Sequence, residues 1–175
     1  IESALPSLIL VSSIALGVAL TLYPYMIAKL QIVVGSDSWF YLWKLSSVNG
    51  LSDAVPLLQT ERGPFILLLF LVKIITGLDT AWAVKLTPAL LSALFALSSF
   101  VLVREGTGRS WVASFAALLS VVSAQTALGM SAFIITNWFA LSLVNFTFAL
   151  IVRSVRRRSA IAALGSLAVP LVLLA

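Results

Sequence analysis

The sequence predicts an all-α, polytopic integral membrane protein that folds as a helical bundle. Apolar residues make up 61% of its 175 residues and charged residues only 10%, and the mean hydropathy is +1.13. This composition is too apolar for the surface of a soluble globular protein. Long uncharged stretches separate the charged residues, and about 20 apolar residues in a helix cross roughly 30 Å of hydrocarbon. Each long stretch is therefore a candidate membrane span.

The uncharged stretches predict five spans. Residues 3–28 carry no charge, so a helix over 5–28 has length to spare, and Pro24 is expected to kink or end it. The uncharged stretch 110–152 is long enough for two helices, broken near Gly129 and Asn137. Because the sequence has no initiator Met and stops inside an apolar run, we expect it to be a piece of a longer chain. The predicted spans are 5–28, 84–103, 110–129, 135–152 and 159–175.

Basic residues set the predicted orientation. Arg104 and Arg109 bracket one tight turn, and four arginines lie within 153–158. The positive-inside rule places both groups in the cytoplasm. The N-terminus is then cytoplasmic, residues 29–82 form a large extracytoplasmic loop, and we expect the protein in the plasma membrane.

The apolar segment 64–78 differs from the others because it is short for a crossing and contains Lys73. It fits an interfacial or re-entrant helix better. If it crossed the membrane instead, Asp37 would move to the cytoplasmic side. The first topology is preferred because it keeps four acids in one loop: Asp37, Asp53, Glu61 and Asp79.

A second helix is predicted inside this loop, over 38–48. Helical spacing places Asp37, Tyr41 and Lys44 along one face, and the opposite side carries Trp39, Leu42 and Trp43. Such a helix would lie on the membrane with its aromatic rings at headgroup depth. Asp37 has two compatible interpretations: it caps this helix at its N-terminus, or it is a metal or substrate ligand.

The chain has no cysteine and no histidine, which excludes disulfides, thiolate chemistry and catalysis by histidine. Any catalytic group must be a carboxylate, hydroxyl, amide, Lys or Arg. Glu61 and Arg62 form either an exposed pair at a loop end, or a base and a phosphate-binding cation. Lys85 either snorkels to the interface or contacts a pyrophosphate at headgroup depth.

The run Gly-Ser-Asp-Ser-Trp-Phe-Tyr at 35–41 resembles the Asp-Pro-Trp-Phe/Tyr signature of oligosaccharyltransferase catalytic subunits, which are integral-membrane glycosyltransferases of the GT-C type. In that family the acid lies in the first external loop and binds the catalytic metal. The order of the other features is also similar to the family's N-terminal module: Gly63-Pro64-Phe65 before an apolar run, Lys85 and Pro88 at the start of a crossing, the turn 104–109, and Ser123–Gly129 before a second external loop.

The resemblance implies a GT-C-like fold and an enzyme that transfers a sugar or oligosaccharide from a polyprenyl-phosphate-linked donor. The acceptor would be a protein, a lipid or another glycan on the extracytoplasmic face. A divalent cation, Mg²⁺ or Mn²⁺, would bind at Asp37. The candidate site residues are Asp37 and Glu61 for catalysis, and Tyr41, Lys44, Arg62, Lys85 and Asn137 for substrate binding.

The chain departs from the family pattern at the second acidic motif. The corresponding stretch 131–138 has no acid, and no Asp or Glu follows Glu105, which weakens the prediction of a metal. Thr136 and Asn137 would supply neutral oxygen ligands there, or Asn137 caps the helix that follows.

Two other functions remain open at this point. If the missing acid means lost chemistry, the chain is a structural or lipid-binding subunit of a membrane complex. A transporter is disfavoured because the long spans carry no charges at mid-membrane. Nucleic-acid binding is not expected despite a pI near 10.1, because no soluble domain presents the basic residues.

Overall fold

The protein is helical, with no strand among the residues that the computed structural model describes: 4–35, 37–60, 62–123, 136–158 and 164–166. Three helices within these ranges are long and apolar enough to cross a membrane: α1 (Ala4–Met26), α5 (Thr80–Thr107) and α8 (Thr136–Arg157). Their length and composition are compatible with an integral membrane protein.

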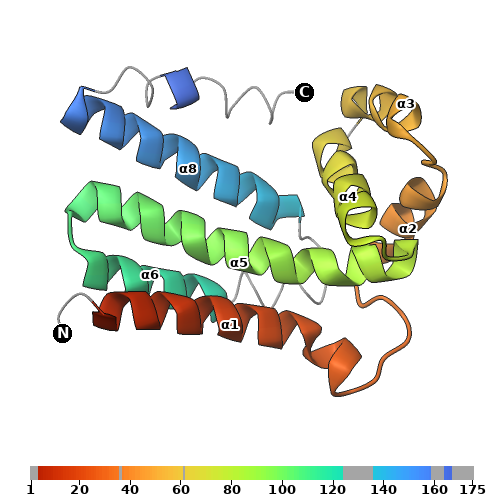
Figure 1. The fold of residues 1–175 in the computed structure, drawn as a ribbon, viewed down its shortest axis with the longest axis horizontal. Coiled ribbons are helices and arrows are strands. Elements are labelled where there is room, and N and C mark those ends of the chain that lie inside the picture. Colours follow the sequence, from red (N-terminus) through yellow and green to blue (C-terminus); the bar gives the residue numbers. More distant parts are fainter. Residues whose placement is uncertain (1–3, 36, 61, 124–135, 159–163, 167–175) are drawn as a thin grey trace.

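Helix α5 is the centre of a bundle in which α1, α5, α8 and the shorter α6 (Ser110–Val121) run side by side (Figure 1). A tight turn reverses the chain between α5 and α6. Gly108 adopts a left-handed conformation with φ of 73° and donates its N–H to the carbonyl oxygen of Arg104 at 2.8 Å. Glycine takes this conformation at no steric cost, so it ends α5 and lets α6 return along it.

Small residues bring α1, α5 and α6 into close contact. A side chain at Gly17 in α1 would meet the hydroxyl of Ser92 in α5 and the side chain of Val121 in α6. The Ser114 hydroxyl in α6 donates a hydrogen bond to the carbonyl oxygen of Pro6 in α1 at 2.7 Å. Small residues and interhelical hydroxyl contacts are the usual basis of helix packing in membranes. There the hydrophobic effect does not drive helices together, because lipid tails are as apolar as the helix surfaces.

A group of short helices covers the N-terminal end of α5. It contains α2 (Ser38–Ser46), α3 (Leu51–Ala54), the 3-10 turn η1 (Pro56–Gln59) and α4 (Gly63–Thr76). Figure 1 shows α4 lying across the direction of the long helices. Six side chains form much of the core between this group, α5 and the start of α8: Tyr41, Leu45, Phe65, Ile66, Leu69 and Trp138.

Polar capping and proline shape α5. The carboxylate of Asp79 accepts a hydrogen bond from the backbone N–H of Trp82 at 2.7 Å and so caps the helix at its N-terminus,. Pro88 lies inside the helix. Proline has no N–H, so the helical hydrogen bond to the residue four positions earlier is missing there.

The observed helices compare with the predicted spans as follows. α5 extends beyond 84–103 at both ends, and α8 extends beyond 135–152 into the arginine cluster. α1 continues past Pro24 to Met26. In place of 110–129, α6 ends at Val121, and residues 124–129 lie outside the described residues. Only 164–166 of the predicted span 159–175 are described, and they are helical. Sidedness stays a prediction.

The contact at Gly17 leads to a prediction about stability. Gly17→Leu should destabilise the folded protein by about 1–3 kcal/mol, because the added side chain would be forced between three helices. Unfolding of the purified protein in detergent micelles measures this change. Gly106→Leu is the matched control, since nothing lies within 4 Å of a side chain added at that helical glycine. Equal effects of the two substitutions would contradict the close approach.

Candidate functional site

Arg62 and Asp37 form an ion pair at the surface of the short-helix group. The Nη1 atom of Arg62 lies 2.7 Å from Oδ2 of Asp37 and donates a second hydrogen bond to the hydroxyl of Tyr41 at 3.2 Å. The guanidinium also lies over the ring of Phe40, 5.6 Å from its centroid. Three of the predicted site residues, Asp37, Tyr41 and Arg62, are thus brought together.

Asp37 directly precedes α2, but its carboxylate makes no capping hydrogen bond with the helix. The capping interpretation of this side chain is therefore wrong in this structure, and the carboxylate pairs with Arg62 instead. A capping carboxylate would have accepted an N–H from the first turn of α2. The guanidinium offers a charge-assisted and therefore stronger hydrogen bond.

The backbone at Arg62 has a rare conformation that turns its side chain toward Asp37. Arg62 has a φ of 66° in the left-handed region, where residues other than glycine are uncommon,. It is followed by Gly63, at which a side chain would collide with the backbone of Leu57 and Leu58. Glycine is therefore required where the chain passes η1 and enters α4, and this turn presents Arg62 to Asp37.

Tyr41 lies on the buried side of the ion pair and supports it. Its side chain is fully buried and packs edge-on against Phe65, with ring centroids 5.0 Å apart. Its hydroxyl hydrogen-bonds with Arg62 and with Thr136, the first residue of α8. One phenol therefore connects α2, α4 and α8 beneath the charged pair.

Burial and hydrogen bonding keep Tyr41 and Arg62 in defined protonation states. Burial raises the pKa of Tyr41 above its usual 10.0, although the nearby Arg62 charge opposes this, so the phenol is neutral at physiological pH. The hydrogen bond with Asp37 raises the pKa of Arg62, which is therefore always charged. The side chains of Arg62 and Asp37 are 43% and 38% exposed. An exposed ion pair contributes at most about 1 kcal/mol, so a ligand can separate it at low cost.

Lys85 is engaged elsewhere. It is 6% exposed, its ammonium donates to the carbonyl oxygen of Gln31 at 2.6 Å, and it lies over the rings of Tyr25 and Trp82 at 5.3 and 5.0 Å. The Tyr25 hydroxyl accepts the backbone N–H of Val34 at 3.1 Å. Together these contacts fix the segment that leads to Asp37.

Two further predicted residues, Lys44 and Asn137, make no hydrogen bond to this network in the described part of the chain. Lys44 lies over the ring of Trp43, 4.8 Å from its centroid. Asn137 is exposed as the second residue of α8, so it does not occupy the capping position before the helix. Glu61 lies outside the described residues.

A mostly apolar groove of about 530 Å³ is lined by Gly35 and Ser38, which flank Asp37 in the sequence, but not by Asp37 or Arg62. Its walls come from the segment before α2, from the outer face of α2 and from the start of α5. Trp39 is the most exposed of its large side chains at 78%. The lining residues are Gln31, Ile32, Val33, Val34, Gly35, Ser38, Trp39, Leu42 and Ala81.

The oxygen donors around Asp37 do not by themselves suit a divalent cation. The described residues contain no cluster of three or more metal-ligating Asp, Glu, His or Cys side chains. The carboxylate of Asp37 is paired with a guanidinium, and the other oxygens in this hydrogen-bond network are the neutral hydroxyls of Tyr41 and Thr136. Mg²⁺ is usually held by one or two carboxylates that are free to coordinate. Metal binding at Asp37 stays a prediction.

Sequence reasoning missed the contacts that organise this site. It did not foresee Arg62 as the partner of Asp37, Gln31 as the partner of Lys85, or the packing of Phe65 against Phe139 at 6.4 Å. The adjacent Arg62-Gly63-Pro64 was the one available signal, because glycine followed by proline marks a tight entry into a helix.

No protein-family model matches the chain, no curated protein matches its sequence, and no solved structure matches its fold. The functional argument therefore depends on the geometry described above.

Replacing Tyr41 tests its supporting role. Tyr41→Phe should lower the free energy of unfolding by about 1–3 kcal/mol, because the hydrogen bonds of the hydroxyl to the charged Arg62 and to Thr136 are lost. Unfolding in detergent micelles measures the loss. Tyr23→Phe is the matched control, since Tyr23 is 56% exposed. Equal losses in both variants would refute the role.

The raised pKa of Tyr41 has a measurable consequence at alkaline pH. Because the folded state holds the phenolic proton more tightly than the unfolded state, the associated stability is present below pH 10.0 and is lost as pH rises beyond it. The tyrosinate absorbance of the wild type minus that of Tyr41→Phe should therefore have its midpoint above pH 10.0. A midpoint below this value would contradict burial of the phenol.

Proposed function

We propose that this chain is the N-terminal part of a membrane glycosyltransferase that uses a polyprenyl-phosphate-linked sugar donor. One observation carries the proposal: an exposed Asp37–Arg62 pair rests on the buried Tyr41, and the residues that flank Asp37 in the sequence, Gly35 and Ser38, line a mostly apolar groove. A lipid-linked donor needs a cation for its phosphate, an acid or base near its sugar and an apolar surface for its isoprenoid chain.

The donor phosphate binds by replacing Asp37 at Arg62. A guanidinium binds phosphate through paired hydrogen bonds, and Arg62 is held for this by its stacking on Phe40,. Since the pair is exposed and weak, the exchange costs little. The carboxylate of Asp37 is then released beside the bound donor.

The transfer step forms one bond and breaks one. The acceptor oxygen attacks the anomeric carbon of the sugar, and the bond between that carbon and the phosphate oxygen breaks. Asp37 takes the proton of the acceptor hydroxyl as a general base. Arg62 stabilises the negative charge that develops on the departing lipid phosphate. No step in this scheme requires a metal.

The groove lined by Gly35 and Ser38 is proposed to hold the first isoprene units of the donor. Its position between α2 and the start of α5 leaves it open to the surrounding bilayer in the predicted topology. The exposed Trp39 and Trp43, at 78% and 64%, suit headgroup depth. The reaction would then occur on the extracytoplasmic face, with a protein, lipid or glycan as acceptor.

A transfer assay tests this mechanism. The full-length protein is assayed in native membranes with radiolabelled polyprenyl-phosphate sugars. Asp37→Asn should lower kcat by about 10²-fold or more. Asp53→Asn is the matched control, because this loop acid bonds only the neighbouring Asn49 N–H and Ser52 within the described residues, and it should stay within about twofold.

Arg62→Asn separates the two roles in the same assay. Asparagine tolerates the left-handed backbone of position 62, so the variant should fold while its KM for the donor rises and its kcat falls. Full activity with a chelator would remove the metal prediction and leave this mechanism intact. Unchanged transfer in both Asp37→Asn and Arg62→Asn would refute this mechanism, and no transfer by the wild-type protein would favour a structural or lipid-binding subunit.

A further inference from the structure

A second charged site lies at the opposite end of the bundle from Asp37. There the last turns of α5 and α8 and the start of α6 enclose a cavity of about 420 Å³. Three arginines and one glutamate line it together with Gly108 and Ser110: Arg104, Glu105, Arg153 and Arg156. Three positive charges against one negative charge leave the lining with a net charge of +2, which favours an anion.

The guanidinium groups are held in place, and within the described ranges they keep N–H donors that make no hydrogen bond. Arg156 donates from Nη1 to the backbone carbonyl oxygen of Glu105 at 2.5 Å, and a guanidinium has five N–H donors in all. Arg153 lies 4.0 Å from the Glu105 carboxylate, beyond hydrogen-bond distance. Arg104 lies over the ring of Phe100 at 5.8 Å. These contacts orient the charges before a ligand arrives, which lowers the entropic cost of binding.

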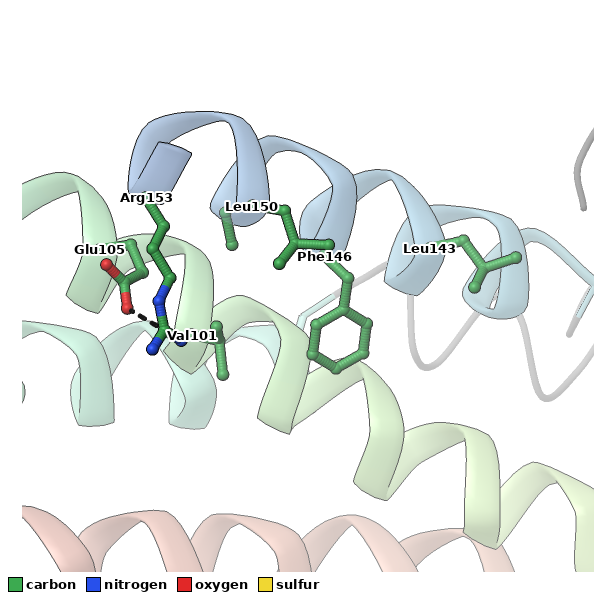
Figure 2. Close-up of a pocket in the computed structure, with 7 residues that line it drawn as sticks. Val101, Glu105, Leu143, Phe146, Leu150 and Arg153 are labelled. Atoms are coloured by element: carbon green, nitrogen blue, oxygen red, sulfur yellow. Dashed lines mark ion pairs between the residues drawn. The ribbon is translucent and has the colours of Figure 1, made fainter. Parts of the chain in front are cut away.

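An apolar groove of about 270 Å³ continues from this cavity between α5 and α8. Figure 2 shows Val101 of α5 and Leu143, Phe146 and Leu150 of α8 along it, with the Glu105–Arg153 pair at one end. Because Glu105 and Arg153 line both the cavity and the groove, the two form one surface with a cationic head and an apolar body.

We propose that this surface is a binding site for an anionic membrane phospholipid. The phosphate of the headgroup pairs with Arg153 and Arg156, and an acyl chain lies along Val101, Phe146 and Leu150. Neither half alone identifies the ligand, since a bare anion would not use the groove and a neutral lipid would not use the arginines. On the predicted sidedness this end faces the cytoplasm, where anionic lipids are concentrated. The proposal does not depend on the proposed glycosyl transfer.

Native mass spectrometry of the full-length protein tests the site. The purified protein is titrated with phosphatidylglycerol and with phosphatidylcholine that carry the same acyl chains. We expect phosphatidylglycerol to bind about tenfold more tightly, because its headgroup leaves the phosphate charge uncompensated. The double variant Arg153→Gln/Arg156→Gln should bind phosphatidylglycerol about tenfold more weakly than the wild type does.

A matched control separates the cavity from general surface charge. Arg109 is exposed in the same turn region but does not line the cavity, so Arg109→Gln should bind phosphatidylglycerol as the wild type does. Val101→Trp fills the groove and leaves the arginines in place. It should weaken the binding of phosphatidylglycerol and leave the binding of inorganic phosphate unchanged. Circular dichroism and the unfolding midpoint identify any variant that fails to fold, and Val101→Phe replaces such a Val101 variant.

Three results would overturn the proposal. If Arg109→Gln and the double variant lose the same affinity for phosphatidylglycerol, the lipid is attracted by surface charge alone. Full competition by inorganic phosphate would mean an anion site without a lipid. Equal binding of the two lipids would mean that the arginines do not select the headgroup, or that a later part of the chain occupies the groove.

Discussion

Close packing of small side chains against α5 is the interaction on which this structure depends. α1, α6 and α8 all lie along this helix, and α2 and α4 pack on its N-terminal end. The close approach of Gly17, Ser92 and Val121 and the hydrogen bond from Ser114 to Pro6 are contacts of the kind that hold helices together in membranes. Both proposed sites are formed at the ends of α5, so its packing fixes the distance between them.

The Asp37–Arg62 site combines a rigid support, the buried Tyr41, with a weak ion pair at the surface. Tyr41 is buried and bonded to two other helices, whereas the ion pair above it is exposed and contributes little to stability,. The left-handed φ of Arg62 shows that the chain accepts local strain to place this guanidinium, and the absence of a side chain at Gly63 lets that residue pass close to η1. Such strain is common where position matters more than stability.

Several features of this structure follow from sequence pattern. The helical class and the long apolar helices could be predicted because helices satisfy backbone polar groups within one segment. The spacing of Asp37 and Tyr41, four residues apart, correctly placed both on one side of a helix start. The partner of Asp37 could not be predicted, because Arg62 is 25 residues away and reaches it through a rare backbone conformation. Snorkelling is the usual behaviour of an interfacial lysine, but a carbonyl and two aromatic rings keep Lys85 buried instead.

The proline inside α5 has a mechanical consequence. At Pro88 the helix lacks one of the hydrogen bonds that stiffen it,, and a helix bends at lowest cost where such a bond is missing. The short-helix group rests on the turns before this point, while α6 and the arginine-lined cavity lie at the far end. A tilt of the short-helix group relative to the long bundle would therefore cost least at this residue.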